Sequence, residues 1–407
     1  MRIAVFVEFF PPNLGSDRRI YELMTRLSKR HEIHFVVLPP FRMLAGKLFL
    51  PQSRFHFLRE ETVVGRQGVL AHYVTVNFLM LKFWKKSYKL AYILTVVTLF
   101  FKIFKSMRRI NPDVVVLNYP SVYTGILGHT IGKRLLRKPT LLDFDDLIAQ
   151  YTIDLLDLPP NSLAAKLCIL IQGFIAKASD KVIAPSSYIE RYALHLAIAP
   201  DKIVAIPNGV DTEYFDPRRF SAEDLRFRLK LGNKKICVYC GRLDNWAGTN
   251  VILHLCDKFG AKDPDVAFVI VGRGAEEGRL FPKNAVIVGE VPYRKVPEML
   301  AIADVVLVPF PDNEVSRAAS PLKLFEGMAM GKATVASEVD GIKDVILNQE
   351  SGVLVKPSDI AAWVEAITDL LNNPSTARRI GGNARRIVKG KYDWKLLAER
   401  YEKNFYV

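Results

Sequence analysis

The chain has 407 residues, of which half are hydrophobic and 24% are charged. This composition is typical of globular proteins and excludes a disordered or fibrous chain. The length predicts two or three domains rather than a single core. The formal net charge of +15 is concentrated in residues 1–200, which contain 27 Lys and Arg against 14 Asp and Glu.

The start of the chain and its four cysteines bear on location and on metal binding. The first residues, MRIAVFVEFF, form a strand-like apolar run and lack the cleavage region of a signal peptide. We therefore expect a cytoplasmic protein. Cys237 and Cys240 lie in one apolar strand, KKICVYCG, with no second pair to complete a zinc site. We expect buried free thiols, no metal and no cofactor.

Short apolar runs rich in β-branched residues alternate with helical stretches along the chain. The first half contains RIAVFVEF, EIHFVVL, DVVVLNY, TLLDFDD, KVIAPS and KIVAIPN. The alternation restarts after residue 230 with KKICVYCG, VAFVIVG, AVIVGE, DVVLVPF and ATVAS. This order predicts an α/β fold with parallel strands and crossover helices. Two doubly wound domains are expected to join in the Pro- and Asn-Gly-containing motif at 206–217, IPNGVDTEYFDP.

Residues 78–110 form a basic and apolar segment, FLMLKFWKKSYKLAYILTVVTLFFKIFKSMRRI. No acid lies between Glu61 and Asp113. Such a segment suits an anionic lipid surface, and it equally suits a domain helix with one buried and one solvated face. Its apolar run, 90–101, is well short of the roughly 20 residues that cross a bilayer. We therefore expect at most peripheral attachment to the cytoplasmic membrane face, and no nucleic-acid partner, because no binding signature accompanies the charge.

Six motifs follow one another in a family's order: PPNLGSDRRIYEL, IPNGVDTEYFDP, GRLDNWAG, FVIVGRGAEEGRL, VGEVPYRKVPEMLAIADVVLVP and SPLKLFEGMAMGKATVAS. Together they resemble the retaining glycosyltransferases of family 4. The resemblance implies the α/β GT-B fold, two facing Rossmann-like domains with the active site in the cleft between them. It implies an acceptor-binding domain at 1–200 and a nucleotide-sugar donor domain at 201–390. The closing residues, 391–407, resemble the C-terminal helix that crosses back to the first domain.

The resemblance places Gly15 at the donor phosphate, after the first strand. A residue without a Cβ lets backbone N–H groups approach a phosphate at a helix N-terminus. The alternative is a plain tight turn. Arg18 and Arg19 open the next helix. Such arginines are more often solvated than bound to a ligand, so we leave both out of the site.

The expected diphosphate site lies in the second domain. Arg242 follows strand KKICVYCG, and its guanidinium suits a diphosphate leaving group, unless it forms a surface ion pair. Five residues later, where the family has a lysine, the chain has Ala247. Lys323 is our candidate replacement, unless it lies on the solvent face of its turn. Ser320 and the backbone N–H groups of Leu322 and Lys323 are expected to face the phosphate.

The remaining donor contacts are less complete. Glu326 matches the family acid that binds the ribose hydroxyls, although an acid near a helix start is also stabilised by the helix dipole. Ala318 stands where the family has a second acid for the sugar. Ser-Pro-Leu-Lys-Leu-Phe-Glu sequences resemble a subgroup with a rebuilt loop, so we interpret this as altered sugar recognition, with Glu314 as a candidate substitute. Gly289 and Val291 are expected to hold the base through backbone contacts.

On the acceptor side, Asp145 stands where many relatives carry a histidine. A carboxylate there could take the acceptor hydroxyl's proton or steady the positive charge that develops on the sugar ring. The alternative is an acid that caps the following helix. Asp143 and Asp145 also form a D-x-D triplet, the manganese-binding mark of a different glycosyltransferase fold, but we expect no metal here.

The implied reaction moves a hexose from a nucleoside-diphosphate sugar to a hydroxyl of a glycan or lipid-linked acceptor, with retention. Hydrolytic retention uses two carboxylates roughly 5 Å apart, and no such pair is evident. The family is thought to attack from the leaving-group side, with the departing phosphate helping to take the proton. Two alternatives stay open: a catalytically inactive GT-B binding or scaffold subunit, and another GT-B enzyme such as an epimerase or a phosphorylase. The donor sugar, base, acceptor and oligomeric state are not specified.

Overall fold

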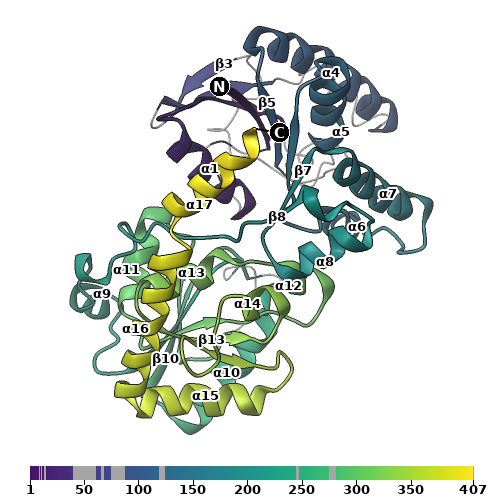
Figure 1. Cartoon of the computed structure of the whole chain (residues 1–407). Coiled ribbons are helices and arrows are strands. Elements are labelled where there is room, and N and C mark those ends of the chain that lie inside the picture. Colours follow the sequence, from purple (N-terminus) through teal and green to yellow (C-terminus); the bar gives the residue numbers. More distant parts are fainter. Residues whose placement is uncertain are drawn as a thin grey trace. The chain divides into compact units, whose positions relative to one another are not determined.

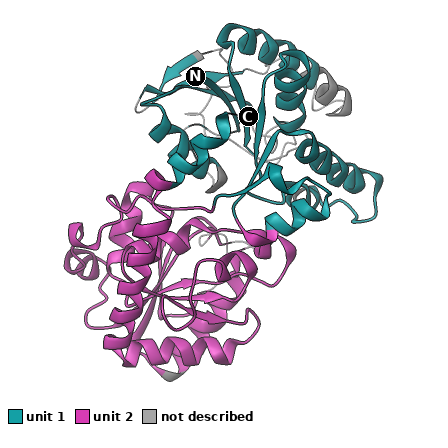
Figure 2. Cartoon of the chain, viewed as in Figure 1, with its two compact units in different colours: residues 1–185, 189–206, 397–407 teal, residues 186–188, 207–396 magenta. Residues whose placement is uncertain are grey.

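The computed structural model describes residues 1–8, 10, 12, 15–39, 61–65, 68–74, 88–118, 124–243, 247–274 and 281–406 (Figure 1). These residues form two compact units (Figure 2). Unit 1 comprises residues 1–185, 189–206 and 397–407, and unit 2 comprises residues 186–188 and 207–396.

Unit 1 is built on an eight-stranded sheet in the order β3-β4-β2-β1-β5-β6-β7-β8. Only the pairing of β3 with β4 is antiparallel among these strands. The buried strands read as nearly continuous apolar runs because helices cover a parallel sheet on both faces. The strands are β1 (Arg2–Val7), β2 (Glu32–Val37), β3 (Glu61–Val64), β4 (Leu70–Tyr73), β5 (Val114–Asn118), β6 (Thr140–Asp143), β7 (Lys181–Ala184) and β8 (Ile203–Ala205).

The helices of unit 1 connect these strands in the expected alternation. They are α1 (Gly15–Leu27), α4 (Tyr88–Ile110), α5 (Thr124–His129), the π-helix η3 (Thr130–Leu135), α6 (Ile148–Leu155), α7 (Leu163–Ala178), α8 (Ser187–His195), the 3₁₀ turns η4 (Pro200–Lys202) and η8 (Lys403–Phe405), and the last part of α17 (Trp394–Glu402).

Helix α4 contains the described part of the basic segment, and residues 78–87 lie outside the described residues. Leu99, Ile103 and Met107 recur every four residues and are fully buried, so α4 packs one face into unit 1 as a domain helix does. Val97 and Phe101 of the same helix are exposed. Across the described residues, no helix is both long and apolar enough to traverse a bilayer.

Unit 2 is built on a six-stranded sheet, all parallel, in the order β11-β10-β9-β12-β13-β14. The strand order reverses between β9 and β12, and doubly wound sheets bind ligands beyond the carboxyl ends of strands at such a point. The strands are β9 (Lys235–Cys240), β10 (Val266–Val271), β11 (Ala285–Gly289), β12 (Val305–Val308), β13 (Ala333–Ser337) and β14 (Val353–Val355).

The helices of unit 2 flank this sheet. They are α9 (Glu223–Arg228), α10 (Thr249–Lys262), α11 (Val296–Ala301), α12 (Glu314–Ala318), α13 (Leu322–Ala329), α14 (Asp340–Lys343), α15 (Ile360–Asn372), α16 (Pro374–Lys391), the start of α17, and the 3₁₀ turns η5 (Pro217–Arg219) and η7 (Tyr293–Lys295).

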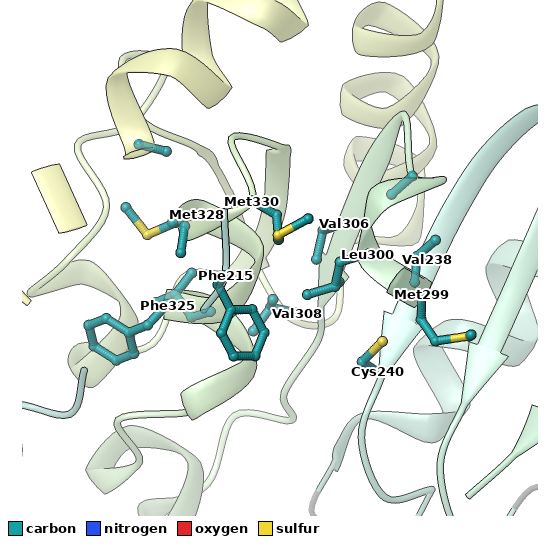
Figure 3. Close-up of a cluster of buried hydrophobic side chains, with 14 of the residues drawn as sticks. Phe215, Val238, Cys240, Met299, Leu300, Val306, Val308, Phe325, Met328 and Met330 are labelled. Carbon is teal, nitrogen blue, oxygen red and sulfur yellow. The ribbon is translucent and has the colours of Figure 1, made fainter. Parts of the chain in front are cut away.

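Alternate residues of β9 pack into different cores of unit 2. Val238 and Cys240 belong to the cluster drawn in Figure 3, with Met299 and Phe325. Cys237 and Tyr239 belong to a second cluster. This alternation follows from the two-residue period of a strand, and it directs Tyr239 away from the cluster that contains Cys240.

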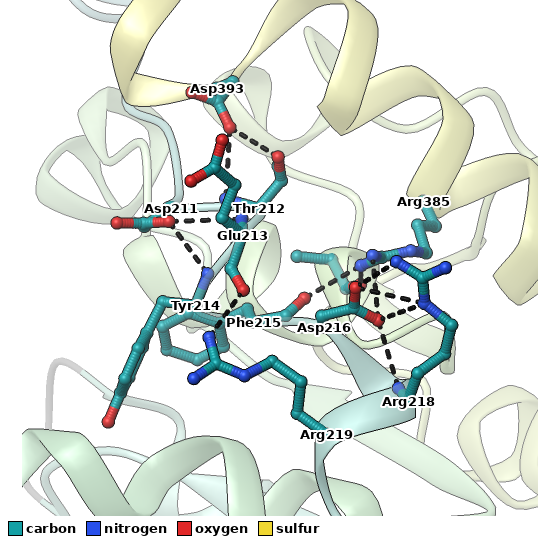
Figure 4. Close-up of polar contacts among 11 residues, drawn as sticks. Asp211, Thr212, Glu213, Tyr214, Phe215, Asp216, Arg218, Arg219, Arg385 and Asp393 are labelled. Atoms are coloured by element: carbon teal, nitrogen blue, oxygen red, sulfur yellow. Dashed lines mark hydrogen bonds and ion pairs between the residues drawn. The ribbon is translucent and has the colours of Figure 1, made fainter.

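Residues 207–217 of the IPNGVDTEYFDP motif belong to unit 2, where polar contacts hold them (Figure 4). The Asp211 carboxylate accepts a hydrogen bond from the backbone N–H of Tyr214 at 2.9 Å. The Asp216 carboxylate accepts from the backbone N–H of Arg218 at 3.0 Å and pairs with Arg385 at 3.3 Å. These acids stabilise the turn that leads into α9, the first α-helix after the motif.

Candidate active site

The loops after β9, β10 and β11 run side by side at the carboxyl edge of the sheet in unit 2. The N–H of Gly241 donates to the carbonyl of Val271, and the N–H of Gly272 donates to that of Gly289, each at 2.8 Å. Gly272 has a φ of +143°, and a Cβ there would lie 1.8 Å from the carbonyl oxygen of Gly241. Only glycine permits this approach, which brings the loop of Arg242 against the loop after β10. The loop after β10 in turn contacts Gly289 at the end of β11 through the Gly272 N–H.

Lys323 lies in the first turn of α13, and its ammonium is held between two aromatic rings. Its Nζ lies 4.5 Å from the ring centroid of Tyr239 and 4.6 Å from that of Phe310. It also donates to the Tyr239 hydroxyl at 3.1 Å. That hydroxyl donates to the backbone carbonyl of Arg242 at 2.6 Å. One buried tyrosine therefore contacts both the Lys323 ammonium and the backbone of Arg242, the two residues whose side chains are expected at the diphosphate.

Glu326 lies one turn after Lys323 on α13 and is buried. The charges of Glu326 and Lys323 both act on the thiol of Cys240. Burial raises the pKa of this thiol, the Glu326 charge raises it further, and the Lys323 charge lowers it. Glu326 and Lys323 therefore lie close to the end of β9. The arrangement supplies a cation and a carboxylate at neighbouring positions, which suits a ligand with both a phosphate and hydroxyl groups.

The loop before α13 is fixed by hydrogen bonds. The backbone N–H of Asn208 donates to Ser320 Oγ at 3.3 Å, and its side-chain amide donates to the Ser320 carbonyl at 2.6 Å. Pro321 stands at the N-cap of α13 and makes no side-chain cap. The N-cap side chain therefore accepts no hydrogen bond from the N–H groups in the first turn, which include those of Leu322 and Lys323. Such a helix N-terminus is a common binding site for an anion.

The two positions where the family pattern is lost are both packed. Ala247 is buried in the second hydrophobic cluster of unit 2. Ala318 ends α12 with no exposed surface, and its carbonyl accepts from Ser186 Oγ at 2.7 Å. Glu314 begins the same helix and is exposed. Both positions therefore carry an alanine where the family has a lysine or an acid. A contact between Glu314 and the donor sugar stays a prediction.

In unit 1, Asp145 belongs to a buried charged cluster around Arg19. The Arg19 side chain has no exposed surface, and its Nε donates to the two carboxylate oxygens of Asp143 at 3.0 and 3.2 Å. Its Nη2 donates to the carbonyl of Ile206 at 2.8 Å, and Asp145 lies 3.8 Å from its Nε. Treating Arg19 as solvated was wrong. Its place in the helical stripe with the buried Leu23 was the available signal.

Asp17 is a further buried acid of unit 1, and the sequence analysis does not single it out. One carboxylate oxygen accepts from the Asn118 amide at 3.3 Å, and the other has no hydrogen-bond partner among the described residues. Burial, with the charges of Glu8 and Asp145, raises the pKa of Asp17 well above its ordinary value. Burial and the charge of Asp145 likewise raise the pKa of Asp146.

The D-x-D triplet does not present two available carboxylates, because Asp143 is paired with Arg19. Within the described ranges, no three metal-ligating side chains come together.

The predicted site residues fall in both units. Gly15, which begins α1, and Asp145 belong to unit 1. The side chain of Val291 packs against the core of unit 2, which leaves its backbone for the predicted base contact. The residues in unit 2 are Arg242, Gly289, Val291, Ser320, Leu322, Lys323 and Glu326.

Two family patterns match almost the whole chain, each on one half. Residues 15–214 match the family described as Glycosyltransferase Family 4, and residues 221–387 match the Glycosyl transferases group 1. The chain is a family 4-like glycosyltransferase. The predicted fold is also confirmed: this glycosyltransferase has the GT-B fold, an α/β architecture of two Rossmann-like domains with parallel sheets.

Relatives of this glycosyltransferase span nearly its full length. It is 22% identical to an uncharacterized glycosyltransferase of Methanocaldococcus jannaschii, over 100% of this chain and 98% of that one. It is 25% identical to the sulfoquinovosyl transferase SQD2 of Arabidopsis thaliana, over 93% of this chain and 74% of that one. The crystal structure of Anabaena HepE in complex with UDP-glucose aligns with a TM-score of 0.73 at 15% identity, covering 99% of both chains.

Proposed function

We propose that this glycosyltransferase moves a hexose from a nucleoside-diphosphate sugar to a hydroxyl of a glycan or lipid-linked acceptor, with retention at the anomeric carbon. The observation that carries the proposal is the contact chain from Lys323 through Tyr239 to Arg242, beside the buried Glu326. The use of a nucleotide sugar is supported by HepE, whose structures contain UDP-glucose and UDP.

In this proposal the diphosphate binds at the start of α13. Negative charge grows on the diphosphate as the glycosidic bond breaks, so cations held in place beforehand stabilise the transition state more than the ground state. The rings of Tyr239 and Phe310 keep the Lys323 ammonium in one position. Arg242 adds a guanidinium from the loop after β9, and Glu326 accepts hydrogen bonds from the ribose hydroxyls.

Asp145 has the second role in the proposal. Its carboxylate lies 3.8 Å from Nε of Arg19, a guanidinium that is also paired with Asp143. We assign Asp145 to steadying the positive charge on the sugar ring or to receiving the acceptor proton, with the departing phosphate sharing that task. The acceptor is assigned to unit 1 and to the cytoplasmic face of a membrane, because the excess basic charge lies in residues 1–200.

A binding or scaffold subunit is the second candidate function. Two buried alanines, Ala247 and Ala318, occupy positions where the family has a lysine and an acid. Such a protein would bind nucleoside diphosphates without turning over any donor.

One experiment separates these functions. A thermal-shift screen with UDP-, GDP-, ADP- and TDP-sugars identifies the donor, and proton NMR then follows transfer or slow hydrolysis of that donor. Retention gives the donor's own anomeric configuration in the first-formed product. An inverted product would refute the retaining mechanism, and binding without turnover for every donor and acceptor would support the scaffold.

A further inference from the structure

Helix α7 carries an apolar stripe on its solvent side. Leu163 is 84% exposed, Leu170 is 68% exposed, and Leu167 and Phe174 are each 52% exposed. Their spacing of four, three and four residues puts them on one face of the helix. A stripe of this kind normally faces a core, and a contiguous apolar surface on a soluble domain marks a contact with a partner or a membrane.

The opposite side of α7 is packed, so the exposure is not a consequence of a loosely attached helix. Ser162 caps the helix by accepting from the N–H of Ala165 at 3.2 Å. Gln172 is buried, accepts from the backbone N–H of Ala149 at 2.9 Å, and donates to the Tyr192 hydroxyl at 3.1 Å. In Figure 1, α7 lies on the outside of unit 1. The fold therefore presents this stripe outward on a fixed support.

Helices near α7 also expose apolar side chains and are rich in basic residues. Helix α5 packs against α7 and continues into η3, which packs against α4. Two of these helices add exposed apolar side chains, Leu135 from η3 and Phe101 from α4. The sequences of α4, η3 and α7 contain five, two and two basic residues, respectively, and no acid. Helix α6, which also packs against α7, adds one exposed acid, Asp154. An apolar stripe beside basic, acid-free helices is complementary to an anionic lipid surface.

We propose that the face formed by Leu163, Leu167, Leu170 and Phe174 docks on an anionic lipid bilayer, with α7 parallel to the membrane plane. The apolar side chains enter the interface, and Lys166 and Lys177 of the same helix contact lipid phosphates. A second copy of this chain fits less well, because dimerisation through α7 would bring two basic faces together. This inference does not depend on the glycosyl donor, because lipid binding can be measured without turnover.

The test uses the full chain in co-sedimentation with vesicles at low salt. Vesicles of phosphatidylcholine with 30 mol% phosphatidylglycerol, about a third anionic as a membrane-like surface, are compared with phosphatidylcholine alone. We expect binding to the anionic vesicles only, and at least a tenfold loss of partitioning in the variant Leu163→Ser/Leu170→Ser. Both side chains are largely exposed, so this variant should keep the wild-type melting temperature.

The matched control is Phe227→Ser, which removes an equally exposed apolar side chain, 84% exposed, from unit 2. It should bind vesicles as the wild type does. Wild-type protein that ignores anionic vesicles, or a double variant that binds them fully, would overturn the proposal. A wild-type dimer in sedimentation velocity that the double variant loses, without vesicle binding, would assign the face to a second copy. Nucleoside-diphosphate binding, measured on the same samples, reports separately on the proposed function.

Discussion

The Arg19 guanidinium lies 3.0 Å from the carboxylate of Asp143, and neither side chain has any exposed surface. The pair joins the middle of α1 to the end of β6. Tyr401 of α17 is fully buried nearby, and the charge of Asp143 adds to the effect of burial in raising the pKa of Tyr401. A buried pair of this kind is costly to break, because removing one partner leaves an uncompensated charge in the interior.

We expect Arg19→Met to destabilise the protein by about 3–5 kcal/mol, the usual effect of removing one partner from a buried pair. Urea unfolding followed by circular dichroism measures the change. The matched control is Arg30→Met, because Arg30 is 59% exposed and pairs with Glu402 at 2.7 Å. Exposed pairs contribute at most about 1 kcal/mol. Equal effects of the two substitutions would show that Arg19 is not the buried partner described above.

Asp17 predicts a dependence of stability on pH. Its pKa is raised in the folded protein, so folding takes up a proton, and stability is lost as the pH rises from the ordinary value of 3.8 through the folded pKa. Asp17→Asn removes this loss and keeps an acceptor for Asn118. Relative to wild type, the variant should gain stability as pH rises from 5 to 7, by at most about 1.4 kcal/mol per pH unit.

Melting temperatures at pH 5, 6 and 7 measure the effect of Asp17→Asn. The control is Asp154→Asn, because Asp154 lies on α6 with an exposed side chain. Its difference from wild type should stay constant over this range. A constant difference for Asp17→Asn as well would contradict the raised pKa.

Lys323 and Tyr239 predict graded effects on transfer. Lys323→Met removes the cation at the start of α13, and we expect kcat to fall by roughly 100- to 1,000-fold, as for other transition-state donors. Tyr239→Phe keeps the ring under the ammonium but loses the hydroxyl that joins Lys323 to the Arg242 loop. Its effect should be smaller, about tenfold. Steady-state kinetics with the identified donor test this order, with the exposed Lys343→Met as the unaffected control.

Replacing glycine by alanine should have opposite effects on stability at Gly272 and at Gly382. Gly272→Ala must separate the loops after β9 and β10, because its Cβ would meet the Gly241 carbonyl, so we expect lower stability and lower donor affinity. Gly382 lies within α16, where a Cβ meets nothing within 4 Å. Gly382→Ala should stabilise by about 0.5–1 kcal/mol. Thermal melts decide, and a stabilised Gly272→Ala variant would show that the two loops are not in close contact.

The sequence predicted which residues lie at the carboxyl ends of strands, but it did not predict which charged side chains are buried. Arg242 and Gly289 follow apolar runs, and the alternation of strands and helices places such residues at one edge of a parallel sheet. Arg19 was misjudged because arginines are mostly solvated, although its helical position lies with buried residues. The partners that hold it, such as the Ile206 carbonyl, are far away in sequence and could not be inferred from spacing.

Two other features could not be predicted from the sequence, each for a physical reason. The antiparallel β3 depends on tertiary pairing with β4, which no local periodicity encodes. The stripe containing Leu163 and Leu170 has the spacing of a core-facing helix, so only the structure shows that it faces solvent. The two rings that contact Lys323 were predictable only in part. Tyr239 and Phe310 lie near the ends of β9 and β12, and the predicted sheet brings strand ends together. It does not specify that the ammonium lies between these two rings.

Calorimetric titration of the 407-residue chain with UDP, GDP, ADP and TDP tests the central claim most directly, because the carboxyl edge of unit 2 is proposed to bind a nucleoside diphosphate. We predict saturable binding of at least one of these nucleotides, and at least a tenfold weaker affinity for it in the folded variant Arg242→Ala/Lys323→Met. No binding of any of the four, or an unchanged affinity in that variant, would contradict the account.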